Sequence, residues 1–109
     1  MTDLVIRSDL GGIARITMGA SAASKGFSSE GIAAIAEVIN CALDDEEIRA
    51  IVITGSGRWF CAGADVAAFS KAIEDDSIVA LVENLTETLH PLLVKMRQSS
   101  TICVAALNG

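Results

Sequence analysis

The run Ile48–Thr54, IRAIVIT, constrains the fold most, because it is nearly all apolar and rich in β-branched residues. Such a run is typical of a strand buried on both faces, as in a parallel sheet. A second buried strand is expected at Thr101–Leu107, TICVAAL. Between them an apolar stripe at helical spacing predicts a long helix, with its members at Ile78, Leu81, Val82, Leu85, Leu89, Leu92, Leu93 and Met96. Strands separated by helices imply parallel pairing with right-handed crossovers, so we expect an α/β fold.

The segments before this unit predict a hairpin and a helix. Leu4–Ser8 and Ile13–Met18 are expected strands, and Asp9–Gly12 is the turn between them. A helix is expected to begin at a capping serine, Ser28 or Ser29, because apolar residues then recur at helical spacing: Ile32, Ile35, Ala36, Ile39, Ala42 and Leu43.

Two further helical features follow Thr54. Asp65–Ile73 predicts a short helix. In the long helix that follows, Pro91 predicts a kink or break near His90, because proline lacks a backbone N–H and clashes with the preceding turn. The expected order is therefore two strands, a helix, a strand, a short helix, a long helix and a strand.

Composition limits the classes of function. Of 109 residues 51% are hydrophobic and 20% are charged, and a single domain this small would struggle to bury so much apolar surface. We therefore expect association with other chains, or a fragment of a larger protein. The net charge of −6 and the lack of a basic cluster argue against nucleic-acid binding. No apolar run approaches the roughly 18 residues of a membrane span, so no membrane partner is expected.

The cysteines and the histidine suggest no metal site. Cys41, Cys61 and Cys103 are odd in number and widely spaced, which fits free thiols in a reducing, cytoplasmic compartment. His90 is the one histidine, so no zinc constellation can be assembled. If Cys61 were a nucleophile, His90 would be its one plausible base. The apolar neighbours of Cys61 instead favour a buried structural thiol.

The loop after Thr54 has small side chains where a helix is about to begin. The first N–H groups of a helix have no partner within it and lie at the positive end of its dipole. Ala62, Gly63 and Ala64 would let a ligand oxygen reach such donors, which is the arrangement of an oxyanion hole. Spacing alone favours tight packing over a ligand site. Gly55–Gly57 lacks the spacing of phosphate-binding loops, which argues against a dinucleotide.

Three segments together resemble the enoyl-CoA hydratase/isomerase (crotonase) superfamily. Ile48–Phe69, IRAIVITGSGRWFCAGADVAAF, is similar to the family's strand, glycine turn and F-x-A-G-x-D segment. Ser100–Gly109, STICVAALNG, resembles the family's strand ending in Asn-Gly, and Lys25–Ile32, KGFSSEGI, resembles its helix start. The resemblance implies a crotonase-like repeated β-β-α spiral, of which residues 1–109 would be the N-terminal part of a single domain, truncated after Gly109.

The resemblance also implies a substrate and its site. The family binds acyl-CoA thioesters, with coenzyme A as part of the substrate and no separate cofactor, and two backbone N–H groups stabilise an enolate. Ala64 would supply the first N–H. The CoA path would be lined by Lys25, Gly26, Ala62, Gly63, Asp65, Val66 and Ala67. A homo-trimer or hexamer is expected for the full-length protein.

The sequence departs from the family pattern at three places. Lys25–Gly26 replaces the usual Asn-Ala, and Ala67 stands where many hydratases carry a lysine that contacts a CoA phosphate. The family's second oxyanion donor and its acid/base glutamates lie beyond the Asn-Gly turn, so we expect residues 1–109 alone to lack activity. The alternatives are an inactive, truncated paralogue that acts as a binding or oligomerisation subunit, and a generic α/β binding domain without affinity for CoA.

Overall fold

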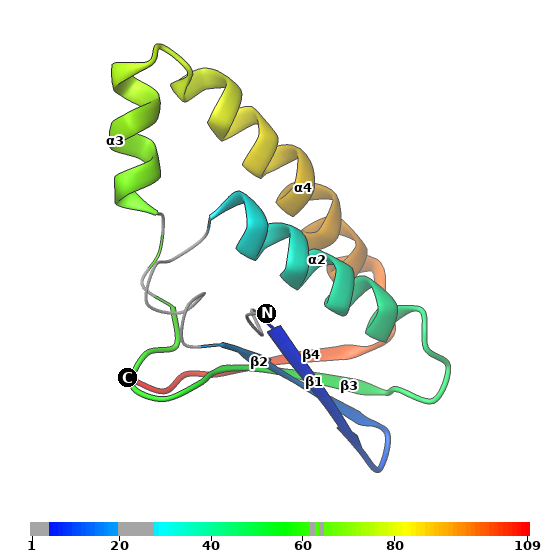
Figure 1. Ribbon diagram of the computed structural model, residues 1–109. Helices are drawn as coiled ribbons and strands as arrows, with labels where there is room; N and C mark the ends of the chain where they lie inside the picture. The colour runs from blue at the N-terminus through cyan, green and yellow to red at the C-terminus, as the bar shows by residue number, and fades with distance from the viewer. Residues whose placement is uncertain (1–4, 20–27, 62, 64) are drawn as a thin grey trace.

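The computed structural model describes residues 5–19, 28–61, 63 and 65–109. Its strands and helices follow the predicted order, as Figure 1 shows. They are the strands β1 (Val5–Leu10), β2 (Ile13–Met18), β3 (Ala50–Gly55) and β4 (Ile102–Ala106), and the helices α2 (Ser29–Leu43), α3 (Val66–Glu74) and α4 (Ile78–Gln98).

The strands form one mixed sheet in the order β1-β2-β3-β4. β1 and β2 are an antiparallel hairpin, whereas β2–β3 and β3–β4 are parallel pairs. The predicted α/β fold with parallel strands is confirmed. The expected burial on both faces is wrong, because one face of the sheet is uncovered in the described part of the chain: four of the five residues of β4 are exposed. Ile51 is fully buried and Ile53 is partly buried, and Val104 pairs with Val52 in the parallel register.

The core lies between the sheet and the helices, which Figure 1 places on one face of the sheet. Alternate residues of β2 point into it, because successive side chains of a strand face opposite sides. The predicted apolar face of α2 packs against them, and Ser28 caps this helix by accepting a hydrogen bond from the Gly31 N–H at 3.0 Å. The buried cluster consists of Ala14, Ile16, Met18, Ile35, Ala36, Ile39, Ala42, Ile48, Ile51 and Leu92.

Helix α4 differs from the expectation in two ways. It continues through Pro91 from Ile78 to Gln98, so the break expected near His90 does not occur. Of its predicted apolar stripe, Leu85 and Leu92 are buried, while Val82 and Leu93 remain 39% and 47% exposed. Val82 is exposed because the first part of α4 extends with α3 beyond the sheet, where the two helices contact each other (Figure 1).

The other face of the sheet is uncovered in the described part of the chain. Its residues alternate with those of the core, and large apolar side chains remain exposed on it at Ile6, Leu10, Ile13, Ile102 and Val104. No helix among the described residues is long and apolar enough to cross a membrane.

Candidate functional site

The candidate site lies where β3 and β4 end. Because the two strands are parallel, their carboxyl ends meet at one edge of the sheet, the usual place for a ligand in α/β proteins. The loop from Gly55 to Asp65 leaves β3 at this edge, and Asn108 and Gly109 follow β4 there (Figure 1).

Asn108 ties the two strand ends together through its side-chain amide. Its Oδ1 accepts a hydrogen bond from the Gly55 N–H at 3.0 Å, and its Nδ2 donates to the Gly57 carbonyl oxygen at 2.9 Å. Next to it the buried Thr54 hydroxyl donates to the Ala106 carbonyl oxygen at 2.8 Å. The turn that begins the loop is therefore bonded to the end of β4.

Two glycines let the loop fold back closely on these ends. A Cβ on Gly55 would overlap the Trp59 carbonyl oxygen and the Phe60 backbone, and a Cβ on Gly109 would overlap the Arg58 carbonyl oxygen. The segment from Arg58 to Phe60 thus lies in direct backbone contact with both glycines, and Phe60 packs against the core. Larger residues at either position would push this segment away from the sheet edge.

The loop then enters α3 through a capped N-terminus. Asp65 is the N-cap: its Oδ1 accepts a hydrogen bond from the Ala68 N–H at 3.2 Å, and its carbonyl oxygen accepts one from Phe69. Gly63 has φ of 94°, a left-handed conformation that side chains disfavour, and its N–H points to the Cys61 sulfur at 3.4 Å. The predicted short helix at this place is therefore present.

The predicted site residues are placed as follows. Gly63 and Asp65 lie in the loop before α3, and Val66 and Ala67 are exposed in its first turn. Lys25, Gly26, Ala62 and Ala64 lie outside the described residues, so the position of the Ala64 N–H stays a prediction. The hydrogen bonds of Asn108 were missed, although an asparagine in the turn that follows a strand was a usable signal.

An apolar cavity of about 180 Å³ lies beside this loop, between the sheet, α2 and α4. Phe60 of the loop forms part of its wall, together with the inward-facing Met18 and Ile53 near the carboxyl ends of β2 and β3. The helices supply the rest of the lining: Ile32, Ile35, Ile39, Leu89, Leu92, Leu93 and Met96. These ten described side chains are all apolar, so the cavity suits a hydrocarbon group.

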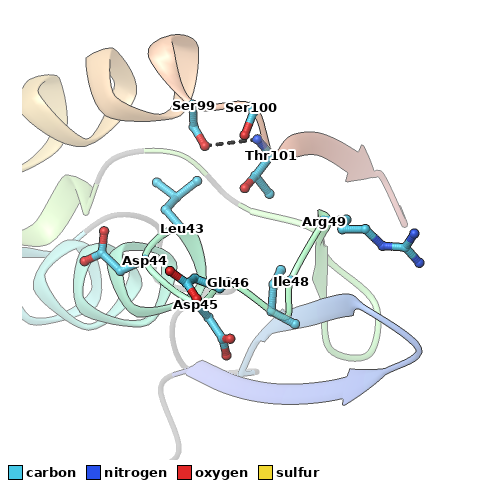
Figure 2. A pocket seen from close by; sticks show the side chains of 9 residues that line it. All are labelled: Leu43, Asp44, Asp45, Glu46, Ile48, Arg49, Ser99, Ser100 and Thr101. Carbon is cyan, nitrogen blue, oxygen red and sulfur yellow. Dashed lines mark hydrogen bonds between the residues drawn. The ribbon is translucent and has the colours of Figure 1, made fainter.

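A polar cavity of about 370 Å³ lies at the opposite, amino ends of β3 and β4 (Figure 2). It is lined by Leu43, Asp44, Asp45, Glu46, Ile48, Arg49, Ser99, Ser100 and Thr101. Figure 2 shows the Arg49 side chain directed away from the acidic side chains of the turn after α2. None of the predicted site residues that the structure describes lines this cavity. Among the described residues no group of three or more His, Cys, Asp or Glu side chains is placed to hold a metal.

Ion pairs fix the acidic turn beside this polar cavity. Arg7 contacts Asp9 and Asp45, each at 2.8 Å, and Lys95 contacts Asp44 at 2.8 Å. The pKa of Asp45 is lowered, first by the hydrogen bond from the Glu47 N–H and then by Arg7. The pKa of Arg7 is raised, chiefly by its hydrogen bond to Asp9. These contacts join α2 to β1 and α4, so they are structural.

The family model of enoyl-CoA hydratase/isomerase matches residues 9–109. The chain belongs to this family. The resemblance drawn from Ile48–Phe69 and the two shorter segments is thereby confirmed.

The relatives are longer than this chain. The probable enoyl-CoA hydratase EchA14 of Mycobacterium tuberculosis is 28% identical over 97 residues, which are 89% of this chain and 36% of that protein. The probable enoyl-CoA hydratase EchA12 of Mycobacterium leprae is 31% identical over 67 residues, 60% of this chain and 23% of that protein. The chain thus spans about a third or less of the length of these curated relatives.

The similar solved structures are also longer than this chain. The Pseudomonas aeruginosa protein PA4980 is 29% identical, with a TM-score of 0.82 over 100% of this chain and 46% of its own. The enoyl-CoA hydratase of Bacillus halodurans has a TM-score of 0.85 over 97% of this chain and 42% of its own, at 19% identity, which shows the fold alone. The described sheet and helices correspond to the N-terminal portion of the crotonase fold.

Proposed function

We propose that this chain forms part of an acyl-CoA thioester site of the hydratase/isomerase type. The Ala64 N–H would donate to the thioester carbonyl oxygen while negative charge builds on that oxygen as an enolate. The observation that carries the proposal is the loop between β3 and α3, seated at the sheet edge and entering a helix N-terminus in a chain of this family. One donor of this kind contributes roughly 3–4 kcal/mol to transition-state stabilisation.

The apolar cavity beside the loop is the proposed place for the acyl chain. Phe60 forms its wall on the loop side, so a thioester held at the loop could extend its hydrocarbon part into the cavity. Burying one methylene contributes about 0.8 kcal/mol, which is roughly a fourfold gain in affinity. Affinity should therefore rise with chain length until the cavity is full.

The CoA part of the ligand is proposed to follow the exposed start of α3. Val66 and Ala67 present small or apolar side chains there, which leave the backbone accessible to an extended ligand. Lys25, Gly26, Ala62, Gly63 and Asp65 complete the proposed path. Since Ala67 has no charge, a contact that lysine makes with CoA phosphate in many hydratases would be missing here.

Calorimetric titration with butyryl-CoA, octanoyl-CoA, CoA and free butyrate tests this proposal. We expect both acyl-CoAs to bind more tightly than CoA, and free butyrate to bind weakly. In Leu89→Phe the added ring narrows the cavity, so octanoyl-CoA should lose affinity while CoA does not. Leu81→Phe, on the same helix and outside the cavity lining, is the matched control. Equal affinity for CoA and the acyl-CoAs would contradict the proposal.

A second candidate is a subunit that binds or assembles without turnover. The exposed apolar face of the sheet favours it, since Leu10 is 83% exposed and Ile102 is 65% exposed. A homo-trimer or hexamer remains our proposal for the full-length protein. Assembly without hydration of crotonyl-CoA would favour this second candidate.

A further inference from the structure

We propose that Asn108 is a positioning residue, which holds the loop carrying Ala64 in register with the end of β4. This inference rests on the proposed function, because it concerns the same oxyanion site. Asn108 would not touch the substrate itself. It would act through the backbone from Gly55 to Asp65.

The side chain of Asn108 continues the sheet where its backbone pairing stops. The last pair between β3 and β4 is Thr54 with Ala106. One step further, the Asn108 amide accepts from the Gly55 N–H and donates to the Gly57 carbonyl oxygen, at 3.0 and 2.9 Å. These two bonds join the turn after β3 to the residue that follows β4 by two positions. The two backbone partners also fix which amide atom is oxygen and which is nitrogen.

The turn is held from its other side as well. The Ser56 N–H donates to the Met18 carbonyl oxygen of β2 at 2.8 Å. The turn therefore spans both neighbouring strands, and Asn108 supplies the bonds on the β4 side. Without them, the turn would stay attached to β2 and become free to shift relative to β4.

Such a shift would reach the proposed oxyanion donor. The segment from Arg58 to Phe60 rests on Gly55 and Gly109, so it follows any movement between these two glycines. Phe60 also lines the apolar cavity, and Cys61 packs against the core. Displacement of this segment would move the Ala64 N–H relative to an acyl group in the cavity and to any group that follows Gly109. Misplacement by about 1 Å can cost roughly 100-fold in rate.

The test measures polarisation of a bound thioester in the longest form of the protein that the gene encodes. The probe is 2,4-hexadienoyl-CoA, because the absorbance of a conjugated thioester moves to longer wavelength when donors polarise its carbonyl oxygen. In Asn108→Ala we expect this shift to fall by half or more, with the affinity for CoA unchanged. Where the wild type hydrates crotonyl-CoA, kcat should fall by about 10–100-fold with little change in KM.

Asn108→Asp gives a second readout that a merely structural role would not predict. The ionised carboxylate keeps the acceptor for the Gly55 N–H but faces the Gly57 carbonyl oxygen without a donor. A protonated carboxyl regains an O–H donor, and this hydrogen bond favours its neutral form. The spectral shift should therefore recover as the pH falls, while the wild-type shift stays constant over the same range. This variant also serves if Asn108→Ala does not fold.

Ile51→Val is the control. It loosens the core on β3, the strand that leads into the loop, but at a position away from the loop itself. It should keep the wild-type shift. An unchanged shift in both Asn108 variants, with wild type binding the probe, would overturn the positioning role and leave the proposed function standing. A wild type that binds the probe with no shift, or does not bind it, would overturn the proposed oxyanion site and this inference with it.

Discussion

Asp65 shows how one residue of the predicted site also serves the fold. It was predicted from the family pattern to line the CoA path, and the structure shows it capping α3 through the Ala68 N–H. An N-cap could be inferred from an aspartate before a helical segment, because its side chain satisfies an unpaired backbone donor. The contact with CoA stays a prediction.

Replacing Asp65 by alanine should lower the free energy of unfolding by about 1 kcal/mol, because the N-terminus of α3 loses its side-chain acceptor. Asp65→Asn keeps an acceptor oxygen and should stay close to wild type. Urea denaturation of the two variants checks this. Equal stability of the alanine and asparagine variants would show that the cap contributes nothing.

Asp45 predicts a pH dependence with a definite sign. Its pKa is lowered from 3.8 by the Glu47 N–H and by Arg7, so the folded state favours the charged carboxylate. This stabilisation is present above about pH 3.8 and is lost as the pH falls through the lower folded pKa. Wild type should therefore exceed Asp45→Asn in stability above that pH, and the difference should vanish in acid.

Denaturation curves measure this difference in stability. They are recorded from about pH 2 to about pH 7, because carboxyl groups titrate within that range. Glu46→Gln removes one charge from the same turn and measures the effect of net charge alone. If the difference in unfolding free energy between wild type and Asp45→Asn grew as the pH fell, the result would contradict the expected pH dependence.

Among the helices and strands, the spacing of apolar residues predicted the position of each element better than it predicted which of its residues are buried. The helical spacing of Ile32, Ile35 and Ile39 placed α2 and its buried face, because that helix lies flat on the sheet. The same kind of pattern in α4 predicted the burial of Leu85 and Leu92 but not the exposure of Val82, since the first part of that helix extends beyond the sheet. Nor could spacing show that the Asn108 side chain reaches back 51 residues to Gly57, because that contact depends on the register of β3 and β4.

Pro91 offers a test of how α4 tolerates proline. Pro91→Ala restores the N–H that the Glu87 carbonyl oxygen lacks as a donor, and we expect unfolding to cost about 1–3 kcal/mol more. Pro91→Gly restores the same N–H without alanine's helix propensity, so its gain should be smaller. Thermal and urea denaturation compare the three proteins. A loss of stability in Pro91→Ala would mean that the proline supports the helix here.

At the scale of the whole molecule, the helices cover one face of the sheet and leave the other apolar and open. Residues 1–109 expressed alone should therefore associate, because exposed apolar patches of more than a few hundred Å² drive association. Replacing Ile102 and Val104 by lysine should raise the monomer fraction in light scattering. Val79→Lys changes an exposed apolar residue of α4 and should not. A monodisperse wild-type monomer at every concentration would contradict this expectation.

The proposed function requires that the loop between β3 and α3 hold a thioester carbonyl oxygen. The most direct measurement is a crystal structure of the longest form of the protein with a bound, unreactive acyl-CoA analogue. We expect the carbonyl oxygen to lie about 2.7–3.1 Å from the Ala64 nitrogen, with the acyl chain in the cavity beside Phe60. An analogue bound elsewhere, or one whose carbonyl oxygen meets no backbone donor of this loop, would contradict it.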